Sequence, residues 1–244
     1  MHIHIIVAMP NKEIVPTKVI QALTTPNLTI TCSCSPTGTS SVRYESELAL
    51  VIPGVIREAI AAEAAGAHAI VIDCMGDPGL FACREQVDIP VVGSAEPAFH
   101  LAMQLGHRFG VVTTGRTVHG MLYRLLQQYG AAPFFSGFCT IDVDPTSDYH
   151  SPEFLHDLTQ ACLQSVTEQN ADVLVMGSGR LVGYRDSIQK TLEANLGYTV
   201  PIIEPLPVAI HMAQLFCHLQ LTSSKIAYPK PPDKPIVGYG DLFN

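Results

Sequence analysis

The stretch that decides the fold is AHAIVIDC at residues 67–74, which matches ADVLVMGS at residues 171–178. Each stretch contains a short apolar run without polar alternation, followed by a glycine-containing turn. This pattern is typical of a strand that is buried on both faces of a parallel sheet. The two runs end at Cys74 and Ser178, so these side chains are expected at the carboxyl ends of equivalent strands.

Two further pairs of segments extend this internal match. HIIVAM at residues 4–9 aligns with RFGVVT at 108–113 at the same offset of 104, and PVVG at 90–93 aligns with PIIE at 201–204 at an offset of 111. Because three pairs follow one another in the same order, the sequence predicts a duplicated unit with a short insertion.

Helical patterns alternate with these strands, which predicts an α/β fold made of two similar lobes with parallel sheets. Ligands of such sheets bind beyond the carboxyl ends of the strands, so we expect the active site in a cleft between the lobes. The predicted lobes are residues 1–96 with 206–244, and residues 97–205. The predicted helices span 49–65, 96–106, 118–130, 151–170, 185–197 and 207–219.

The composition restricts the partners and the location of the protein. A net charge of -8 without a basic run argues against a nucleic-acid partner, so the expected ligand is a small-molecule substrate. Only 15% of the residues are charged, so most of the surface must be neutral or engaged in self-association, and we expect a homo-oligomer. Residues 1–13 do not have the pattern of a secretory signal, and the apolar runs fall short of the roughly 20 residues that a bilayer needs, so we expect neither export nor a membrane span. Seven scattered cysteines then favour reduced thiols in a cytoplasmic protein.

Cys74 is the candidate reactive residue. We expect Asp77 to cap a following helix with Pro78 at its first position, which would place the thiol beside backbone N–H groups and the positive end of a helix. Such a setting lowers a thiol pKa and makes a thiolate available. The other cysteines are interpreted as small buried hydrophobic residues.

Ser178 occupies the equivalent position in the second repeat, between Gly177 and Gly179. Two duplicated side chains facing across a cleft could reach both faces of one carbon. This geometry suggests that a proton α to a carbonyl is removed from one side and returned on the other, while backbone amides hold the enolate oxygen. No cofactor is required for this reaction.

Alternative motifs are weaker. His2 and His4 lie on one face of a strand at a spacing that could bind zinc, but no third ligand is spaced around them. Cys32 and Cys34 likewise have no second pair of cysteines with which to form a metal site. We therefore expect no metal site. Fingerprints of serine hydrolases, nucleoside triphosphatases and dinucleotide-binding proteins do not occur at a strand-to-helix turn.

The block CMGDPGL at 74–80, PVVG at 90–93 with Glu96 and His100, and RFGVVTT at 108–114 resemble hydantoin and allantoin racemases of the aspartate/glutamate racemase superfamily. The final segment TSSK at 222–225 with Tyr228 and Pro229 is similar to the ending of that family. The resemblance implies two flavodoxin-like α/β/α lobes related by a pseudo-twofold axis. It also implies cofactor-independent proton transfer by two cysteines.

The sequence departs from this family at the second cysteine. The family usually has Gly-Cys-Ala-Gly-Met, whereas this chain has Gly-Ser-Gly-Arg-Leu at 177–181, and Met9 replaces the first residue of the usual Asn-Pro-Asn. A hydroxyl is far less acidic than a thiol, so Ser178 is not expected to take a proton as a thiolate would. Beside the catalytic pair Cys74 and Ser178, the expected substrate contacts are Pro10, Asn11, Ser41, Met75, Gly76, Thr113, Thr114, Gly179 and Arg180.

The favoured function is therefore racemase-type proton transfer at a carbon α to a carbonyl or carboxylate of a small hydantoin-like or amino-acid-like substrate, with Cys74 as acid or base. Three alternatives remain. A single thiol could support a decarboxylase or lyase reaction, Cys74 could be the nucleophile of a hydrolase activated by a histidine, or the protein could bind a small molecule without catalysis.

Overall fold

A computed structural model describes residues 1–143, 149, 151–239 and 242 of the chain. The chain divides into two compact units, residues 1–94 with 209–244 and residues 95–208. The boundaries that we expected after residues 96 and 205 differ from these by two or three positions. Each unit is built around its own parallel four-stranded sheet.

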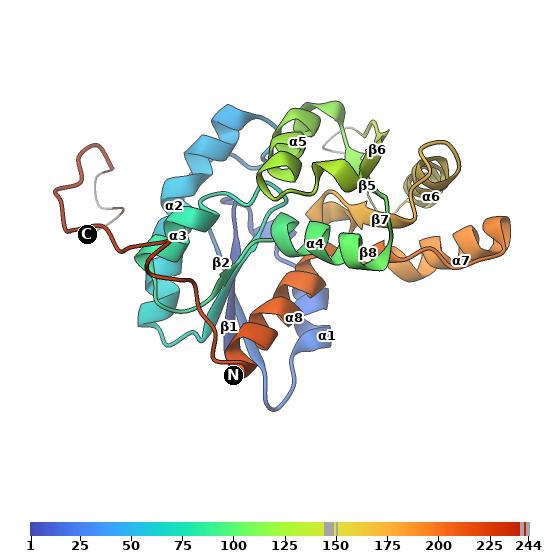
Figure 1. Ribbon diagram of the computed structural model, residues 1–244. Helices are drawn as coiled ribbons and strands as arrows, with labels where there is room; N and C mark the ends of the chain where they lie inside the picture. The colour runs from blue at the N-terminus through green and yellow to red at the C-terminus, as the bar shows by residue number, and fades with distance from the viewer. Residues whose placement is uncertain (144–148, 150, 240–241, 243–244) are drawn as a thin grey trace. The chain divides into compact units, whose positions relative to one another are not determined.

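The first unit has the strand order β2-β1-β3-β4. One face of this sheet packs against α2 and α3, whereas α1 and the end of α8 lie on the other side (Figure 1). This unit contains β1 (His2–Val7), η1 (Lys12–Ile14), α1 (Thr17–Leu23), β2 (Thr29–Cys34), α2 (Glu45–Ala64), β3 (Ala69–Asp73), α3 (Leu80–Gln86), β4 (Val91–Val92) and the second half of α8 (Pro205–His218).

Strand β3 and the second half of β1 carry apolar residues on both faces, and both faces are covered. Ile5 and Ile6 point to opposite faces of β1, and both have 0% exposure. Ile6 joins the cluster formed with Val51 and Val55 of α2. Burial of one such side chain stabilises the fold by about 1.5–3 kcal/mol.

The second unit repeats this plan with the strand order β6-β5-β7-β8. Helix α6 begins where the Ser151 side chain accepts a hydrogen bond from the Phe154 N–H at 3.1 Å, and Pro152 occupies its first position. This unit contains α4 (Ala95–Leu105), β5 (Phe109–Thr114), η2 (Arg116–Val118), α5 (His119–Gln128), η3 (Ala132–Phe134), β6 (Phe135–Ile141), α6 (Pro152–Thr167), β7 (Val173–Met176), η4 (Gly179–Leu181), α7 (Arg185–Leu196) and β8 (Ile202–Ile203).

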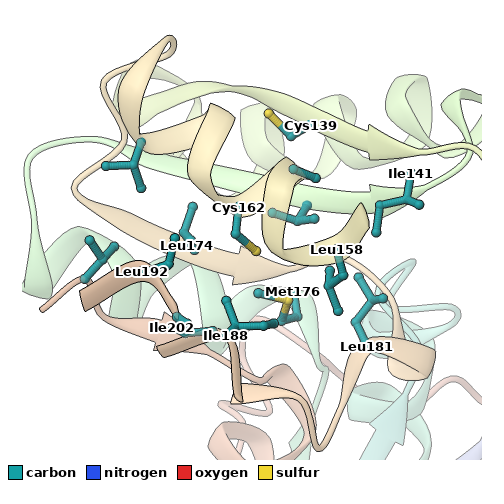
Figure 2. Packing of buried hydrophobic residues seen from close by; sticks show 14 of the residues in the cluster. Cys139, Ile141, Leu158, Cys162, Leu174, Met176, Leu181, Ile188, Leu192 and Ile202 are labelled. Atoms are coloured by element: carbon teal, nitrogen blue, oxygen red, sulfur yellow. The ribbon is translucent and has the colours of Figure 1, made fainter. Parts of the chain in front are cut away.

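The core of the second unit lies between its sheet and helices α6 and α7 (Figure 2). Leu158 and Cys162 of α6 and Ile188 of α7 contact this core, and each has 0% exposure. Leu174 and Met176 of β7 supply the facing surface. The core therefore fixes the direction of β7, whose end leads directly into Ser178.

Sheet register confirms two of the three matched segment pairs and corrects the other. Ile70 pairs with Val91 and Leu174 pairs with Ile202, in agreement with the offsets of 104 and 111. Ile6 pairs with Ile72, however, whereas Val112 pairs with Met176. Strands β1 and β5 therefore correspond at an offset of 106 rather than 104, a two-residue slip that preserves the face to which each side chain points.

The six helices expected from the sequence are present, with ends that shift by at most four residues. Within the described part of the chain, the structure contains no helix with the length and apolar character that crossing a bilayer would need.

Candidate functional site

Cys74 lies one residue beyond the carboxyl end of β3, in a turn that its own backbone helps to form. Its carbonyl accepts a hydrogen bond from the Asp77 N–H at 3.0 Å, and its Sγ accepts one from the Gly76 N–H at 3.4 Å. Cys74 as a residue is half-buried, while Met75 and Gly76 are buried. The strand end therefore presents one thiol with one backbone donor beside it.

The expected cap at Asp77 is wrong. Helix α3 begins at Leu80 with Gly79 as its N-cap, and the buried Asp77 carboxylate instead accepts a hydrogen bond from the Ser94 N–H at 2.7 Å. A Cβ on Gly93 would lie 2.4 Å from an Asp77 carboxylate oxygen, so this position requires glycine. Asp77 thus ties the Cys74 turn to the segment that follows β4.

The expected lowering of the thiol pKa is also wrong. Burial raises the pKa of Cys74 to about 12, the Gly76 N–H lowers it, and the negative charges of Asp77 and Asp73 raise it. The physical reason is that α3 starts six residues later, so its positive end does not offset the cost of removing a thiolate from water. The resting group is therefore a neutral thiol that can donate a proton.

Ser178 occupies the corresponding turn of the second unit. Its Oγ accepts a hydrogen bond from the Arg180 N–H at 3.3 Å, which repeats the contact between Cys74 and the N–H two residues later. A Cβ on Gly177 would lie 2.8 Å from the Thr113 methyl group and 2.9 Å from the Val112 carbonyl oxygen. This close packing fixes the backbone directly before Ser178.

Arg180 does not extend freely from this turn. Its guanidinium carbon lies 4.7 Å from the centre of the Tyr149 ring, a distance at which a cation is attracted to an aromatic face. The Tyr184 hydroxyl donates a hydrogen bond to the Tyr149 carbonyl oxygen. Arg180 therefore contributes a positive charge that is backed by aromatic residues.

Thr113 and Thr114 lie at the end of β5, as expected, but Thr113 is fully buried. Its hydroxyl contacts the Nε2 atom of His119 at 3.2 Å and the Thr140 hydroxyl at 3.3 Å. His119 could not be identified from the sequence, because Thr140 belongs to a different strand and only the folded sheet brings the two residues close together.

The other expected substrate contacts belong to loops of the first unit. Pro10 is exposed and lies shortly after β1. The Cys34 thiol donates a hydrogen bond to the carbonyl oxygen of the next residue, Asn11, at 3.7 Å. Ser41 lies in the loop after β2, where its carbonyl oxygen accepts a hydrogen bond from the Thr39 hydroxyl at 2.6 Å. The first unit thus places Pro10 and Cys74 after neighbouring strands, whereas Ser41 is separated from the end of β2 by several residues.

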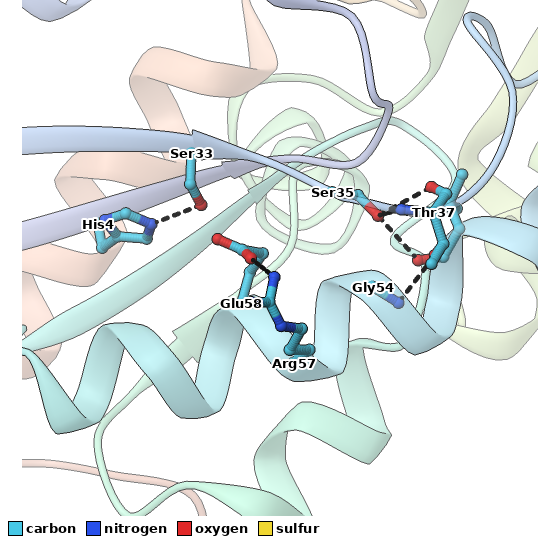
Figure 3. Close-up of polar contacts among 8 residues, drawn as sticks. His4, Ser33, Ser35, Thr37, Gly54, Arg57 and Glu58 are labelled. Carbon is cyan, nitrogen blue, oxygen red and sulfur yellow. Dashed lines mark hydrogen bonds and ion pairs between the residues drawn. The ribbon is translucent and has the colours of Figure 1, made fainter. Parts of the chain in front are cut away.

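The histidines of β1 are engaged in hydrogen bonds to the edge strand β2. Both ring nitrogens of His4 have partners, the Thr31 hydroxyl at 2.8 Å and the Ser33 hydroxyl at 2.9 Å, and Figure 3 shows the second contact. His2 contacts the same Thr31 hydroxyl at 2.7 Å. Among the described residues, no group of three histidine, cysteine or acidic side chains is arranged to hold a metal ion.

A depression of about 330 Å³ on the second unit lies away from these residues. It is lined by residues 170–172 before β7, residues 198–200 before β8, and Val166. Because these segments precede their strands, the depression lies at the opposite edge of the sheet from Ser178, and we do not assign the chemistry to it.

Comparison with known proteins identifies the family. The family model for Asp/Glu/hydantoin racemases matches residues 17–213. Hydantoin racemase of Pseudomonas sp. (strain NS671) is 34% identical over 84% of this chain and 81% of its own length, and that of Rhizobium meliloti is 29% identical over 94% and 95%.

Solved structures agree with this result. Allantoin racemase from Klebsiella pneumoniae has a TM-score of 0.90 and 26% identity, with 99% of this chain and 98% of that chain covered. Arylmalonate decarboxylase is similar in fold alone, with a TM-score of 0.65 and 17% identity over 89% and 92%. The chain therefore belongs to the Asp/Glu/hydantoin racemase family.

Proposed function

We propose that this protein racemises a small hydantoin-like or amino-acid-like substrate without a cofactor, and that Cys74 transfers the proton at the carbon α to the carbonyl. The observation that carries this proposal is the Cys74 turn, in which a half-buried cysteine directly follows a buried strand and its Sγ accepts a hydrogen bond from the Gly76 N–H. Membership of a racemase family supports the reaction class.

The protonation state of Cys74 supports the role of acid. Because burial raises the pKa of this thiol to about 12, the group holds its proton at pH 7 and can give it to a carbanion or enolate. That enolate forms when the substrate first releases its α-proton to a base on the other side of the carbon, and the C–H electron pair moves to the carbonyl oxygen. A thiol of this kind becomes a base only after it has donated its proton.

We assign the substrate contacts to the two strand-end regions of the sheets. In the first unit, the proposed contacts are Met75 and Gly76 of the Cys74 turn, Pro10 and Asn11 after the neighbouring strand β1, and Ser41 of the loop after β2. In the second unit, the contacts are Thr113, Thr114, Ser178, Gly179 and Arg180. The Arg180 guanidinium, backed by the Tyr149 ring, suits a substrate carbonyl or carboxylate oxygen.

The test is loss of optical rotation from single enantiomers of 5-substituted hydantoins, allantoin and small amino acids. The wild-type protein should racemise at least one compound, and Cys74→Ala should slow this at least about a hundredfold because a proton-transfer group has been removed. Cys217→Ala is the matched control, since that thiol belongs to α8 and donates a hydrogen bond to the His68 carbonyl oxygen at 3.5 Å. Racemisation at the wild-type rate by Cys74→Ala would reject the proposal.

A decarboxylase is the second candidate, favoured by the serine at position 178. In that reaction the bond to carbon dioxide breaks, its electron pair forms an enolate, and the neutral Cys74 thiol protonates the enolate on one face. Release of carbon dioxide from an α-substituted malonate, without racemisation of any compound above, would favour this candidate. A cysteine hydrolase is less well supported, because no described histidine is hydrogen-bonded to Cys74. Detection of a covalent acyl adduct on Cys74 by mass spectrometry would favour the hydrolase instead.

We also propose that the protein forms homo-oligomers and works in the cytoplasm. The small share of charged residues, 15%, supports self-association. Seven cysteines, all free, suit a reducing compartment. Sedimentation equilibrium would test the first point, and a monomer at micromolar concentration would contradict it.

A further inference from the structure

Ser94, two residues after β4, forms hydrogen bonds on both sides of Cys74. Its N–H donates to the Asp77 carboxylate at 2.7 Å, three residues after the thiol. Its hydroxyl donates at 2.9 Å to the Ile72 carbonyl oxygen, which also accepts the Cys74 N–H at 3.1 Å. Ser94 and Asp77 are both buried, with 1% and 6% exposure. One serine of the first unit therefore holds the backbone before the thiol and the turn after it.

The conformation of Asp77 is closely specified by its surroundings. Its backbone lies in the left-handed region, with φ at 43°, which among residues with a side chain is adopted mainly by asparagine, aspartate and histidine. Its carboxylate packs directly on Gly93, where a Cβ would lie 2.4–2.6 Å from the carboxylate atoms. An uncommon backbone conformation that is held by close packing is typical of functional sites.

The second unit shows the same turn without this carboxylate. At the offsets of 104 and 111, Leu181 corresponds to Asp77 and Pro205 corresponds to Ser94. The Leu181 N–H donates to the carbonyl oxygen three residues before it at 3.0 Å, as the Asp77 N–H does in the first unit. Leu181 and Pro205 are buried, and a proline has no N–H to donate. The hydrogen bonds of the turn therefore form with an apolar pair at these two positions.

The carboxylate accompanies the thiol rather than the turn. Burying a carboxylate costs free energy that burying a leucine does not. The unit that carries Cys74 nevertheless has Asp77, whereas the unit that carries Ser178 has the apolar pair. Burial raises the pKa of Cys74 most, and the negative charge of Asp77 raises it further. The carboxylate is therefore explained by its effect on Cys74, not by the needs of the turn.

Resting on the function proposed above, we propose that Asp77 is the positioning residue of Cys74, which holds the turn against Ser94 and places a negative charge near the thiol. The hydrogen bond to Ser94 keeps the turn in the form that presents the Gly76 N–H to the Cys74 Sγ at 3.4 Å. The charge disfavours the thiolate, so the thiol keeps its proton until an enolate accepts it. An amide at position 77 separates these effects, because it retains the first and removes the second.

The first measurement is the pH dependence of Cys74 alkylation by iodoacetamide, which needs no substrate. Asp77→Asn keeps an oxygen that accepts the Ser94 N–H and tolerates the positive φ, but it removes the charge. Cys74 of this variant should react at least about threefold faster than in the wild type between pH 8 and 10, because a lower thiol pKa gives more thiolate. The gain should exceed that of Asp73→Asn, since Asp77 raises the thiol pKa more. An unchanged or slower rate would reject the role of the charge.

The second measurement is racemisation at pH 7 of a compound that the wild-type protein converts. Asp77→Gly permits the same φ but lacks the carboxylate, so kcat should fall at least about tenfold, with a smaller change in KM. Asp77→Asn should keep kcat within about threefold of wild type, because the hydrogen bond to Ser94 remains and the thiol is still protonated at this pH. Racemisation by Asp77→Gly at the wild-type rate, or equal losses in the two variants, would reject positioning through this hydrogen bond.

Asp172→Asn is the matched control in the second unit, because the Asp172 carboxylate also accepts hydrogen bonds from backbone groups, the His107 and Arg108 N–H at 2.9 Å each. It should leave both the Cys74 alkylation profile and kcat unchanged. If it shifts the profile as much as Asp77→Asn does, the effect is not local and the proposal is wrong. If the wild-type protein racemises no compound, the proposed function has failed, whereas the alkylation profiles still decide whether the Asp77 charge acts on the thiol.

Discussion

Cys74 and Asp73 are adjacent in the chain but point to opposite faces of β3, because side chains alternate along a strand. Cys74 packs against the cluster that α2 and α3 cover, whereas burial on the other face raises the pKa of Asp73 to about 7. No described residue forms a hydrogen bond with the Asp73 carboxylate. Above pH 7 its negative charge therefore opposes formation of the Cys74 thiolate.

This arrangement predicts the pH dependence of Cys74 alkylation by iodoacetamide. Because only the thiolate reacts and the pKa is about 12 rather than 9.0, the rate should rise about tenfold per pH unit between pH 8 and 10, without reaching a plateau. Asp73→Asn removes one negative charge and should shift the whole profile to lower pH. Peptide mass spectrometry after timed quenching measures the alkylation rate of Cys74 at each pH in the wild type and in Asp73→Asn.

Asp88→Asn is the control for this measurement, because the Asp88 side chain is 80% exposed and is paired with Lys225. A plateau of the Cys74 rate near pH 9, or identical profiles for the wild type and Asp73→Asn, would contradict the assigned cause. The sequence alone predicted a lowered pKa here. It identified the strand end correctly but contained no measure of burial, which decides the direction of the shift.

At the scale of elements, the C-terminal segment holds α3, the helix that follows the Cys74 turn. The Lys225 ammonium donates to the Arg84 and Val87 carbonyl oxygens at 3.0 and 2.6 Å, where the end of α3 carries partial negative charge. Phe81 stacks on Tyr228 with centroids 5.9 Å apart. A segment far from Cys74 in sequence therefore supports the helix beside it.

Lys225→Ala should lower the free energy of unfolding by about 1–3 kcal/mol, because charge-assisted hydrogen bonds to two carbonyl groups are lost. For a chain of this size each kcal/mol corresponds to about 2–4 °C in Tm. Asp88→Asn should leave Tm nearly unchanged, since an ion pair with so exposed a carboxylate contributes little. Differential scanning calorimetry compares the two, and an equal loss in both would assign the stability to the ion pair instead.

Elements with a buried apolar face could be predicted from the sequence, and elements without one could not. The central strands β3 and β7 are continuous apolar runs and were identified directly. The edge strand β2 reads TITCSC, with polar residues in alternation, and α1 has no fully buried residue, so neither gives a clear signal. The expected position of β1 relative to β5 was wrong by two residues, because short apolar strands align almost equally well at either spacing.

At the scale of the whole molecule, duplication explains why one chain presents two equivalent strand-end turns. Cys74 and Ser178 each accept a hydrogen bond from the N–H two residues later. The sequence could predict these two positions because each directly follows a central strand. It could not predict His119, whose partners Thr113 and Thr140 meet only after β5 and β6 have paired.

The first unit is formed by two separate segments of the chain and the second by one continuous segment. This difference predicts which fragments of the chain will fold on their own. Residues 95–208 form the second unit from one continuous segment, and every member of its buried cluster lies within that segment. This fragment should fold alone and unfold cooperatively, because a separate core and a continuous chain are what an independent domain needs. Residues 1–94 alone lack Lys225 and the buried Ala209, Ile210 and Ala213 of α8, so they should remain largely unfolded.

A fusion that joins residues 1–94 to 209–244 through a flexible Gly/Ser linker should restore folding, since it returns α8 and the Lys225 contacts to the first sheet. Circular dichroism and thermal unfolding of the three fragments measure the outcome. Cooperative unfolding of residues 1–94 alone would show that the C-terminal segment adds little to this unit. A disordered 95–208 fragment would show that the second unit depends on the first, and would contradict the independence inferred from its core.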